Sequence, residues 1–373
     1  MVACQAGTVY QIEKQMCNLS PNFPRRLFYT LILLGFFLSV LAGCVPGGGS
    51  HGRSQTLPPI GTEVPPGTTA ADPSAVSPDG YVEPIPPLPS KGYLLQSLAK
   101  DVYFFSTGVY NNMFIVTPEG VIITDPIKGA GRLLAKAIQE TTMLPVKIMI
   151  YSHPHLDHIG DASLFAKPGV KIIAHKATQK LLQRYRDPAR PIPSITFGEK
   201  SVIELGGVRV EMIYPGPGHG EGNIMIYLPQ KKILMYVDVA TPKSVPFKNF
   251  STVDIYGQVV GLKRALQLDF KTYVAGHLFR PGKKEEMQEV LKYTMAVKRA
   301  NAAAMRRVDI REVMRTSASQ DIENKMGEYY EAVAEECYRL LKPTWKPRLM
   351  GFEAFARGHC DTWTAFHRTH KAP

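Results

Sequence analysis

The chain has 373 residues, which is enough for one large hydrophobic core and an accessory region. Its formal net charge is +12, but no block of basic residues interleaved with aromatic ones stands out, so nucleic-acid binding is not indicated. We interpret the positive charge as a property of the solvated surface.

The first segment has the features of a secreted protein. Arg25 and Arg26 precede an apolar run, and the Leu-Ala-Gly-Cys sequence ending at Cys44 resembles the lipobox that the bacterial lipoprotein signal peptidase cuts. The run is short for a membrane span, and no basic stop-transfer cluster follows it. We therefore expect residues 1–43 to be a signal peptide. A lipid on Cys44 would anchor the protein in the bacterial cell envelope, with the rest of the chain in the periplasm or outside the cell.

Residues 44–92 are expected to form a flexible tether. Eleven of the 30 prolines fall between residues 45 and 90, among many Gly, Ser and Thr, and the stretch has no apolar periodicity. Such a composition cannot bury enough apolar surface to offset the entropy lost on ordering. The tether would hold the following domain, residues 93–282, away from the membrane.

Between residues 93 and 282 the sequence alternates between strand and helix patterns. Short β-branched and aromatic runs predict strands at residues 102–107, 114–117, 121–125, 146–151, 202–204, 208–213, 224–228 and 233–237. Apolar residues at helical spacing predict helices at residues 131–142, 177–186 and 255–268. This alternation indicates a mixed α/β class.

Three histidines and a carboxylate directly follow the apolar run 146–151. The segment places His153, His155, Asp157 and His158 within six residues. Ionisable side chains at the end of a buried strand are costly unless they are paired or bound to a metal. Imidazole nitrogen and carboxylate oxygen are ligands that suit zinc and similar divalent ions. The segment therefore predicts a metal site.

This motif resembles the signature of the metallo-β-lactamase superfamily, and three later residues fit the same pattern. His219 follows a glycine-rich turn, Asp238 ends an apolar run, and His277 ends the last predicted core strand. Four motifs in the right order make a far more specific signal than one. The resemblance spans about residues 101–281 and implies an αβ/βα metallo-β-lactamase-type sandwich.

The resemblance also implies how the ligands divide between two metal ions. There are two sets of three ligands and one bridging residue, namely His153, His155 and His219, then Asp157, His158 and His277, with Asp238 as the bridge. Two zinc ions are expected, with iron or manganese as the alternatives. A hydroxide held between the ions would be the nucleophile. Asp157 is the candidate to orient that hydroxide and to pass a proton to the leaving group.

Two further residues are candidates for supporting roles. Asp125 ends a predicted strand and would hold a metal-binding histidine by its other ring nitrogen, or else cap a turn or helix. Asn223 resembles an asparagine that lies near the substrate carbonyl in β-lactamases, or else it simply begins a strand. Asp238 stands where the best-known zinc β-lactamases have a cysteine, and this departure weakens a true β-lactamase assignment.

The resemblance implies a zinc-dependent hydrolase that acts on a small ester, lactone or amide, β-lactams included, so the expected partner is a small-molecule substrate. Two other activities on this fold stay open, an iron-dependent oxidoreductase similar to sulfur dioxygenases and a metal-dependent phosphodiesterase. The intact ligand set argues against a non-catalytic binding protein. Substrate specificity is expected to lie in the loops 108–113 and 241–252.

Residues 283–373 lie outside the resemblance and are expected to form a helical extension. One apolar stripe predicts a helix over residues 283–308, and a second stripe begins at Ile322 and is expected to end at Lys342-Pro343. These helices either pack on the core or form a cap that shapes the substrate pocket or an oligomer contact. The sequence leaves this choice open.

The extension also holds two cysteines that a secreted protein could pair. Cys337 and Cys360 are able to form a disulfide in an oxidising compartment, but the sequence does not give their distance. His359 precedes Cys360, and one such adjacent pair is too little for a metal site, so we interpret it as structural.

Overall fold

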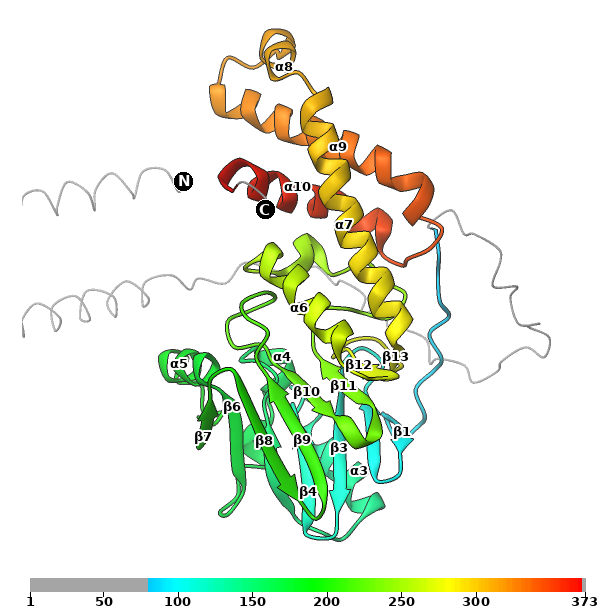
Figure 1. Ribbon diagram of the computed structural model, residues 1–373, viewed down its shortest axis with the longest axis vertical. Helices are drawn as coiled ribbons and strands as arrows, with labels where there is room; N and C mark the ends of the chain where they lie inside the picture. Colours follow the sequence, from blue (N-terminus) through cyan, green and yellow to red (C-terminus); the bar gives the residue numbers. More distant parts are fainter. Residues whose placement is uncertain (1–79, 371–373) are drawn as a thin grey trace, which may run out of the picture. The chain divides into compact units, whose positions relative to one another are not determined.

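The computed structural model describes residues 80–370. The expected signal peptide, the lipidation site Cys44 and the expected tether up to residue 79 lie outside the described residues. Two β-sheets pack face to face in the described part, with helices on the outer face of each (Figure 1). Between residues 80 and 370, every helix is too short or too polar to cross a membrane.

The first sheet has seven strands, arranged in the order in which they occur along the chain. They are β1 (Leu94–Ala99), β2 (Val102–Ser106), β3 (Asn111–Thr117), β4 (Gly120–Thr124), β5 (Val146–Ile150), β6 (Lys171–His175) and β7 (Ile195–Phe197). Strands β1 to β4 pair antiparallel, and β4 to β7 pair parallel. Parallel neighbours need a crossover, which α3 (Gly131–Thr141) supplies between β4 and β5. The residues that follow β4 and β5 therefore meet at one edge of the sheet.

The second sheet has six strands in the order β13-β12-β11-β10-β9-β8. They are β8 (Lys200–Leu205), β9 (Val208–Ile213), β10 (Met225–Leu228), β11 (Ile233–Tyr236), β12 (Thr272–Val274) and β13 (Gly282–Lys283). The β8–β9 hairpin turns at Gly206 and Gly207, which both have positive φ. Strands β11 and β12 are parallel and are joined through α6 (Ile255–Gln267), so the residues that follow them also meet at one edge.

Apolar side chains between the two sheets form the central core. Met113, Ile122 and Ile150 of the first sheet are buried there together with Ile226 and Met235 of the second. Helix α3 covers the outer face of the first sheet, and α6 and the helix after β13 cover that of the second. The expected αβ/βα sandwich with a C-terminal helical extension is therefore confirmed.

The described part of the extension contains four helices in place of the expected pair, namely α7 (Lys284–Arg307), α8 (Ile310–Thr316), α9 (Ile322–Trp345) and α10 (Phe352–Thr369). Helix α9 does not end at Pro343, as the sequence predicted, but continues to Trp345. A proline removes one hydrogen bond from a helix, and here that loss falls in the last turn. The buried Trp345 ring packs on Tyr293 of α7 and holds this turn in place.

The C-terminal helices share a hydrophobic core with the loop that follows β11. Val245 and Phe250 of that loop and Val259 of α6 are buried together with Val333 of α9 and Phe352 of α10. The extension is therefore packed on the domain that carries the metal motif. The same loop also reaches that motif, as described below.

A disulfide joins the last two helices. Cys337 of α9 and Cys360 of α10 are both fully buried, and their Cα atoms lie 6.0 Å apart. The pairing that the sequence left open is thus present in the structure, and it ties α10 to α9.

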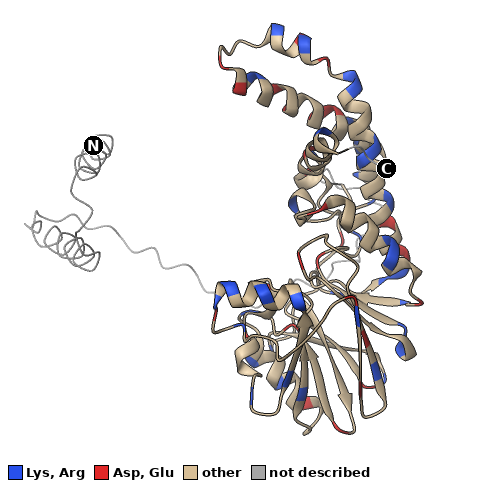
Figure 2. Cartoon of the chain, turned by 60° about the vertical axis from the view of Figure 1, so that its left-hand side comes forward, with Lys and Arg blue, Asp and Glu red and all other residues tan. Residues whose placement is uncertain are grey.

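Residues 80–92, the last part of the expected tether, contact the body of the protein. The Tyr81 N–H donates to the Lys346 carbonyl over 3.0 Å, and the Glu83 carboxylate pairs with the Arg280 guanidinium. Elsewhere, Lys and Arg residues are distributed over helices and strands (Figure 2), which agrees with a net charge that belongs to the surface in general.

Candidate metal centre

The histidine motif lies at the carboxyl end of β5. His153 and His158 are buried, whereas His155 is exposed and Asp157 is partly exposed. Two hydrogen bonds fix the segment: Ile224 N–H donates to the Ser152 carbonyl (2.9 Å), and the Arg190 guanidinium donates to the Pro154 carbonyl (2.6 Å). Short α4 (Leu156–Ile159) then turns the last two residues of the motif back toward the first.

The three later residues reach the same place from the second sheet. His219 comes from the loop between β9 and β10, Asp238 follows β11, and His277 follows β12. The Asp238 N–H donates to the Ala275 carbonyl over 3.0 Å, which couples the ends of β11 and β12. His277 forms an isolated bridge with Tyr110, which couples the second sheet to the loop before β3.

The Asp238 carboxylate is the centre of the cluster. Its Oδ2 lies 3.1 Å from His158 Nε2, 3.3 Å from His219 Nε2 and 3.5 Å from His153 Nε2. Its Oδ1 lies 3.1 Å from His277 Nε2. One carboxylate therefore touches four imidazoles from three segments of the chain, which is the arrangement expected of a bridging ligand.

The potential ligands fall into two groups, and within each group the ligand atoms lie within 4.8 Å of one another. The groups are His153, His155, His219 and Asp238, and then Asp157, His158 and His277. All seven residues that the sequence singled out are thus brought together, in the two sets that the resemblance implied. Several of their buried ring nitrogens, His153 Nε2 and His158 Nδ1 among them, have no hydrogen-bond partner. Such a donor set fits divalent cations.

A hydrogen-bond relay fixes the tautomer of His153. Asp125 accepts from the Ser152 N–H (2.7 Å) and from the Ser152 hydroxyl (2.5 Å), and the hydroxyl oxygen lies 2.8 Å from His153 Nδ1. Because the single hydroxyl proton is given to Asp125, His153 Nδ1 must carry a proton and donate it. The unprotonated Nε2 then faces the cluster, as a metal ligand must.

This relay corrects one of the two roles considered for Asp125. A direct hydrogen bond to a metal-binding histidine is not present, because Ser152 lies between the carboxylate and the ring. Burial raises the pKa of Asp125 to about 6, against the opposing effects of His158 and of the Ser152 hydrogen bonds. No sequence pattern marked Ser152, because a serine beside a histidine motif is common.

Without cations, a proton on His158 balances the negative charge of Asp238. Burial opposes protonation of His158, but the charge and hydrogen bond of Asp238 outweigh it and raise the pKa of His158 to about 9. Burial likewise opposes ionisation of Asp238, yet His158 and the hydrogen bonds hold its pKa well below the usual range. Burial, together with the neighbouring His158, lowers the pKa of His153. The ionised Asp238 carboxylate is therefore stabilised by a positive charge next to it, and bound cations would supply that charge.

Asn223 does not lie where a substrate-binding role would place it. Its side chain is 2 % exposed and donates through Nδ2 to the Val237 carbonyl (3.0 Å). It does not line the cavity beside the cluster. Asn223 therefore supports the backbone next to Asp238, and the expectation of a contact with the substrate carbonyl is corrected.

A cavity of about 470 Å³ opens beside the cluster. Its lining consists of Val109, Tyr110, His155, Asp157, His219, Asp238, Thr241, Ser244, Val245, Phe247, Ser251, His277, Leu278 and Phe355. The two loops in which specificity was expected both contribute to it. Phe355 comes from α10, so the extension also forms part of the wall, and no pattern in the sequence pointed to this residue.

Tyr110 is a second residue that the sequence did not single out. Its ring lies 4.7 Å from the ring of His277 and 5.7 Å from that of His158, measured between centroids. Burial, followed by the negative charges of Asp157 and Asp238, raises the pKa of Tyr110. The phenol therefore stays protonated and can donate a hydrogen bond into the cavity.

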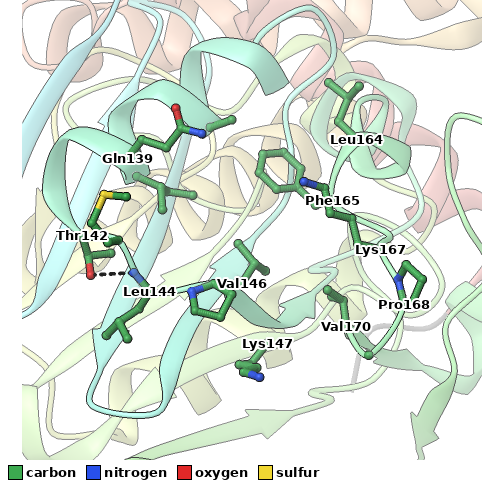
Figure 3. Close-up of a pocket in the computed structure, with 15 residues that line it drawn as sticks. Gln139, Thr142, Leu144, Val146, Lys147, Leu164, Phe165, Lys167, Pro168 and Val170 are labelled. Atoms are coloured by element: carbon green, nitrogen blue, oxygen red, sulfur yellow. Dashed lines mark hydrogen bonds between the residues drawn. The ribbon is translucent and has the colours of Figure 1, made fainter.

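A second cavity of about 430 Å³ lies at the opposite end of β5, near Val146 (Figure 3). It is bounded by the end of α3 and by the segment 164–170. Its lining is mostly apolar, with Lys147 and Lys167, and includes no His, Cys, Asp or Glu. Of these two cavities, only the one beside the cluster is lined by histidines and aspartates.

The remaining buried histidines have structural partners. His175 accepts from the Ala177 N–H at the start of α5 (Lys176–Tyr185) and stacks on Tyr214. His359 lies between the Tyr293 hydroxyl and the Phe247 carbonyl. The structural interpretation of His359 agrees with these contacts.

Comparison with known proteins finds a family model that matches the central part of the chain. Residues 106–277 match the family model described as "Metallo-beta-lactamase superfamily". The match includes all seven clustered residues. It leaves out α7 to α10.

Two curated relatives and one solved structure are examples of the proteins that the chain resembles. The chain is 32% identical over 189 residues to "2,4-dinitroanisole O-demethylase subunit alpha" of Nocardioides sp. (strain JS1661), covering 49% of this chain and 57% of that protein. It is 28% identical over 137 residues to "Metallo-beta-lactamase type 2" of Bacillus cereus, covering 35% and 52%. The chain thus spans little more than half the length of these relatives. The structure "Metallo-beta-lactamase from Pontibacter korlensis" matches with a TM-score of 0.47 and 22% identity, covering 54% of this chain and 99% of that one.

Proposed function

The chain belongs, through residues 106–277, to the metallo-β-lactamase superfamily, and from that membership we propose that it is a metal-dependent hydrolase of a small ester, lactone or amide. The observation that carries this proposal is the Asp238 carboxylate in contact with His153, His158, His219 and His277 beside an open cavity. A reactive centre walled by apolar groups is the usual form of a small-molecule active site.

Zinc is the proposed metal, since four-coordinate sites of imidazole and carboxylate suit it. His153, His155 and His219 would hold one ion and Asp157, His158 and His277 the other, with Asp238 between them. Divalent cations in such a site lower the pKa of water and polarise a carbonyl group. The relay from Asp125 through Ser152 keeps His153 oriented for this role.

Two protein groups at the cavity are placed to move or share a proton. Asp157 lines the cavity, is partly exposed, and lies 3.6 Å from His158 Nε2 through its Oδ2. It is the proposed carrier of the proton to the leaving group. The Tyr110 hydroxyl is the proposed hydrogen-bond donor to a substrate oxygen, because its phenol stays protonated.

Cleavage of an aryl alkyl ether is a second candidate. The relative that is 32% identical carries the name of an O-demethylase, and two phenylalanines line the cavity here. A phosphodiester is less well supported, because no Lys or Arg of the described residues lines the cavity. An iron-dependent oxygenase stays open until the metal is measured.

The test is a panel assay with the whole chain loaded with zinc. The panel contains a lactone, an aryl ester, a thioester, an aryl methyl ether, a phosphodiester and a chromogenic β-lactam, each with and without chelator. We expect chelator-sensitive turnover of one carbonyl substrate or of the ether. Oxygen uptake by an iron-loaded sample, with no turnover by the zinc form, would replace the hydrolase with an oxidoreductase.

Asp157→Asn is the first variant for that assay. We expect kcat to fall by about 100-fold or more, because a carboxamide cannot carry the proton. Asp269→Asn is the matched control, since the Asp269 side chain forms only an exposed ion pair with Lys232, and its contact with the Tyr227 hydroxyl is made by the backbone carbonyl. Equal rates for Asp157→Asn and the unchanged chain would remove Asp157 from the mechanism.

We also propose that the protein acts in the cell envelope, attached through Cys44. The basis is the lipobox-like sequence that ends at this residue. In a bacterial host, the unchanged chain should incorporate labelled palmitate and partition with membranes, whereas Cys44→Ala should do neither. Membrane partitioning of Cys44→Ala, or no label in the unchanged chain, would rule out the anchor.

A further inference from the structure

The cavity beside the cluster has an aromatic wall built from two distant parts of the chain. Phe247 comes from the loop after β11, and Phe355 comes from α10, which lies beyond the residues that match the superfamily model. Their ring centroids are 5.1 Å apart and the rings meet edge to face. Because His155 and His219 line the same cavity, a group held against this wall would lie next to the reacting bond.

The mouth of the cavity exposes apolar side chains to water. Phe247 is 65 % exposed and Val109 is 60 % exposed, and both line the cavity. Leu278 and the buried Val245 extend the apolar lining toward the cluster. Contact with an apolar group would remove this surface from water, which favours binding.

Two cationic side chains close to the cavity in sequence are paired with carboxylates, and a third, the exposed Lys248 beside Phe247, does not line the cavity. Lys243, beside Ser244 of the lining, points its Nζ to the Glu289 carboxylate at 2.9 Å. Arg280, two residues after Leu278, pairs with Glu83 and with Glu286 (2.7 Å). Among the described residues, neither Lys nor Arg lines the cavity. A carboxylate or phosphate on a substrate, remote from the metal ions, would find no cationic partner there.

The wall is held in position by the C-terminal helices. His359 of α10 donates from Nε2 to the Phe247 carbonyl (3.1 Å), and its Nδ1 accepts from the Tyr293 hydroxyl (2.8 Å). The Val245 N–H donates to the Met350 carbonyl over 3.0 Å. A wall fixed before binding loses little conformational entropy when a ligand packs against it.

We infer that the substrate is an uncharged molecule with an apolar, preferably aromatic, group beside the reacting bond, and that Phe247 and Phe355 select it. The inference rests on the proposed function only for the nature of that bond. The recognition of the neighbouring group follows from the wall alone, and it can be measured without turnover.

The test uses three hydroxamates that share one metal-binding group. Acetohydroxamate has no ring, benzohydroxamate has a neutral ring, and 4-carboxybenzohydroxamate has the same ring with a negative charge. Their Kd values for the zinc-loaded whole chain are measured by titration calorimetry. We expect benzohydroxamate to bind about tenfold more tightly than either of the others, the size of effect that burial of part of a ring supports.

Three variants then test whether Phe247 and Phe355 cause the preference for benzohydroxamate. Phe355→Ala and Phe247→Ala should each lower the benzohydroxamate-to-acetohydroxamate ratio about fivefold, with Phe355→Leu in between, while acetohydroxamate binds as before. Phe366→Ala is the matched control, because Phe366 lies on the same helix, is also half-buried and does not line the cavity. It should leave the ratio unchanged.

A positive charge introduced at the mouth of the cavity tests the inference that the substrate is uncharged. Val109→Lys should tighten binding of 4-carboxybenzohydroxamate about fivefold and leave acetohydroxamate unaffected. Four results would each overturn the inference. The first two concern the benzohydroxamate-to-acetohydroxamate ratio, which would be below twofold in the unchanged chain or would not change in either phenylalanine variant. The others are tighter binding of the carboxylated probe than of benzohydroxamate by the unchanged chain, and no binding of any probe. The expected ratios combined with no turnover on any panel substrate would reject the hydrolase and leave the selectivity of the wall standing.

Discussion

At the scale of single residues, the metal centre depends on side chains that the ligand pattern does not include. Ser152 links Asp125 to His153 through two hydrogen bonds, and Asn223 donates a hydrogen bond to the backbone beside Asp238. A buried carboxylate with two short hydrogen bonds is stable only while both donors remain. The ligands thus need partners that hold their rings and backbones in place.

Ser152→Ala tests this dependence. We expect zinc affinity to fall about 10- to 100-fold, because His153 loses the partner that fixes its tautomer. The free energy of unfolding should also fall by about 1–3 kcal/mol, since Asp125 is left with one donor in a buried site. Competition with a chromophoric chelator and urea unfolding measure the two effects.

Ser163→Ala is the control for this change. Ser163 is exposed, and only its backbone groups form hydrogen bonds with the described residues. Wild-type zinc affinity in Ser152→Ala would mean that the relay does not orient His153.

At the scale of elements, α10 connects the stability of the extension to the shape of the cavity. It carries Phe355 of the wall, His359 that holds the Phe247 carbonyl, and Cys360 of the disulfide. A change in the packing of this helix should therefore alter both stability and ligand recognition.

His359 predicts a pH dependence of stability. Burial lowers its pKa to about 4, whereas a histidine in an unfolded chain titrates near 6.5. Between these values the unfolded chain binds the additional proton, so the free energy of unfolding decreases as the pH falls from about 6.5 to about 4. The loss from this group is roughly 3 kcal/mol, and above pH 6.5 it should vanish.

The measurement compares urea unfolding of the metal-free chain at pH 7 and pH 4 with that of His359→Phe. The variant should be less sensitive to acid, although the buried metal-site histidines still titrate in both proteins. His370→Phe, at an exposed position, should behave as the unchanged chain does. The same acid sensitivity in His359→Phe would show that His359 is not the group responsible.

The disulfide predicts a dependence of stability on redox conditions. Cys337 and Cys360 are 23 residues apart, so opening the bond should lower the free energy of unfolding by about 3 kcal/mol. Guanidinium unfolding with and without a phosphine reductant measures this. The reductant should not affect the double variant Cys337→Ala, Cys360→Ala, and equal stability of the oxidised and reduced wild type would contradict the prediction.

At the scale of the whole molecule, the extension and the metallo-β-lactamase-type domain form one hydrophobic unit. Val245, Phe250 and Ile255 of the metallo-β-lactamase-type domain are buried against α7, α9 and α10. Each such side chain contributes about 1.5–3 kcal/mol when it is fully buried. The extension is therefore part of the folded core as well as of the cavity wall.

Removal of residues 284–373 tests this interdependence. We expect the truncated chain to aggregate or to unfold at much lower denaturant concentrations, because it exposes Phe250 and its neighbours. Solubility and circular dichroism measure the outcome. A soluble, cooperatively folding truncated chain that still binds zinc would mean that the two parts are independent.

The sequence by itself determined the fold class and the candidate ligands. Each ligand directly follows a short apolar strand or a glycine-rich turn, and such local patterns can be read from neighbouring residues. The strands predicted at residues 224–228 and 233–237 are likewise present as β10 and β11, which pair because a tight turn joins them. The predicted end of α9 at Pro343 was wrong, since burial of Trp345 outweighs the local effect of the proline.

Only the tertiary structure decided which distant side chains meet. Phe355 lies against Phe247, Cys337 against Cys360, and Ser152 between Asp125 and His153. None of these contacts has a periodic or spaced signature, because each depends on how helices and loops pack across a shared core. Local hydrogen bonding and apolar periodicity determine the elements, whereas the shape of the cavity depends on packing between segments that lie far apart along the chain.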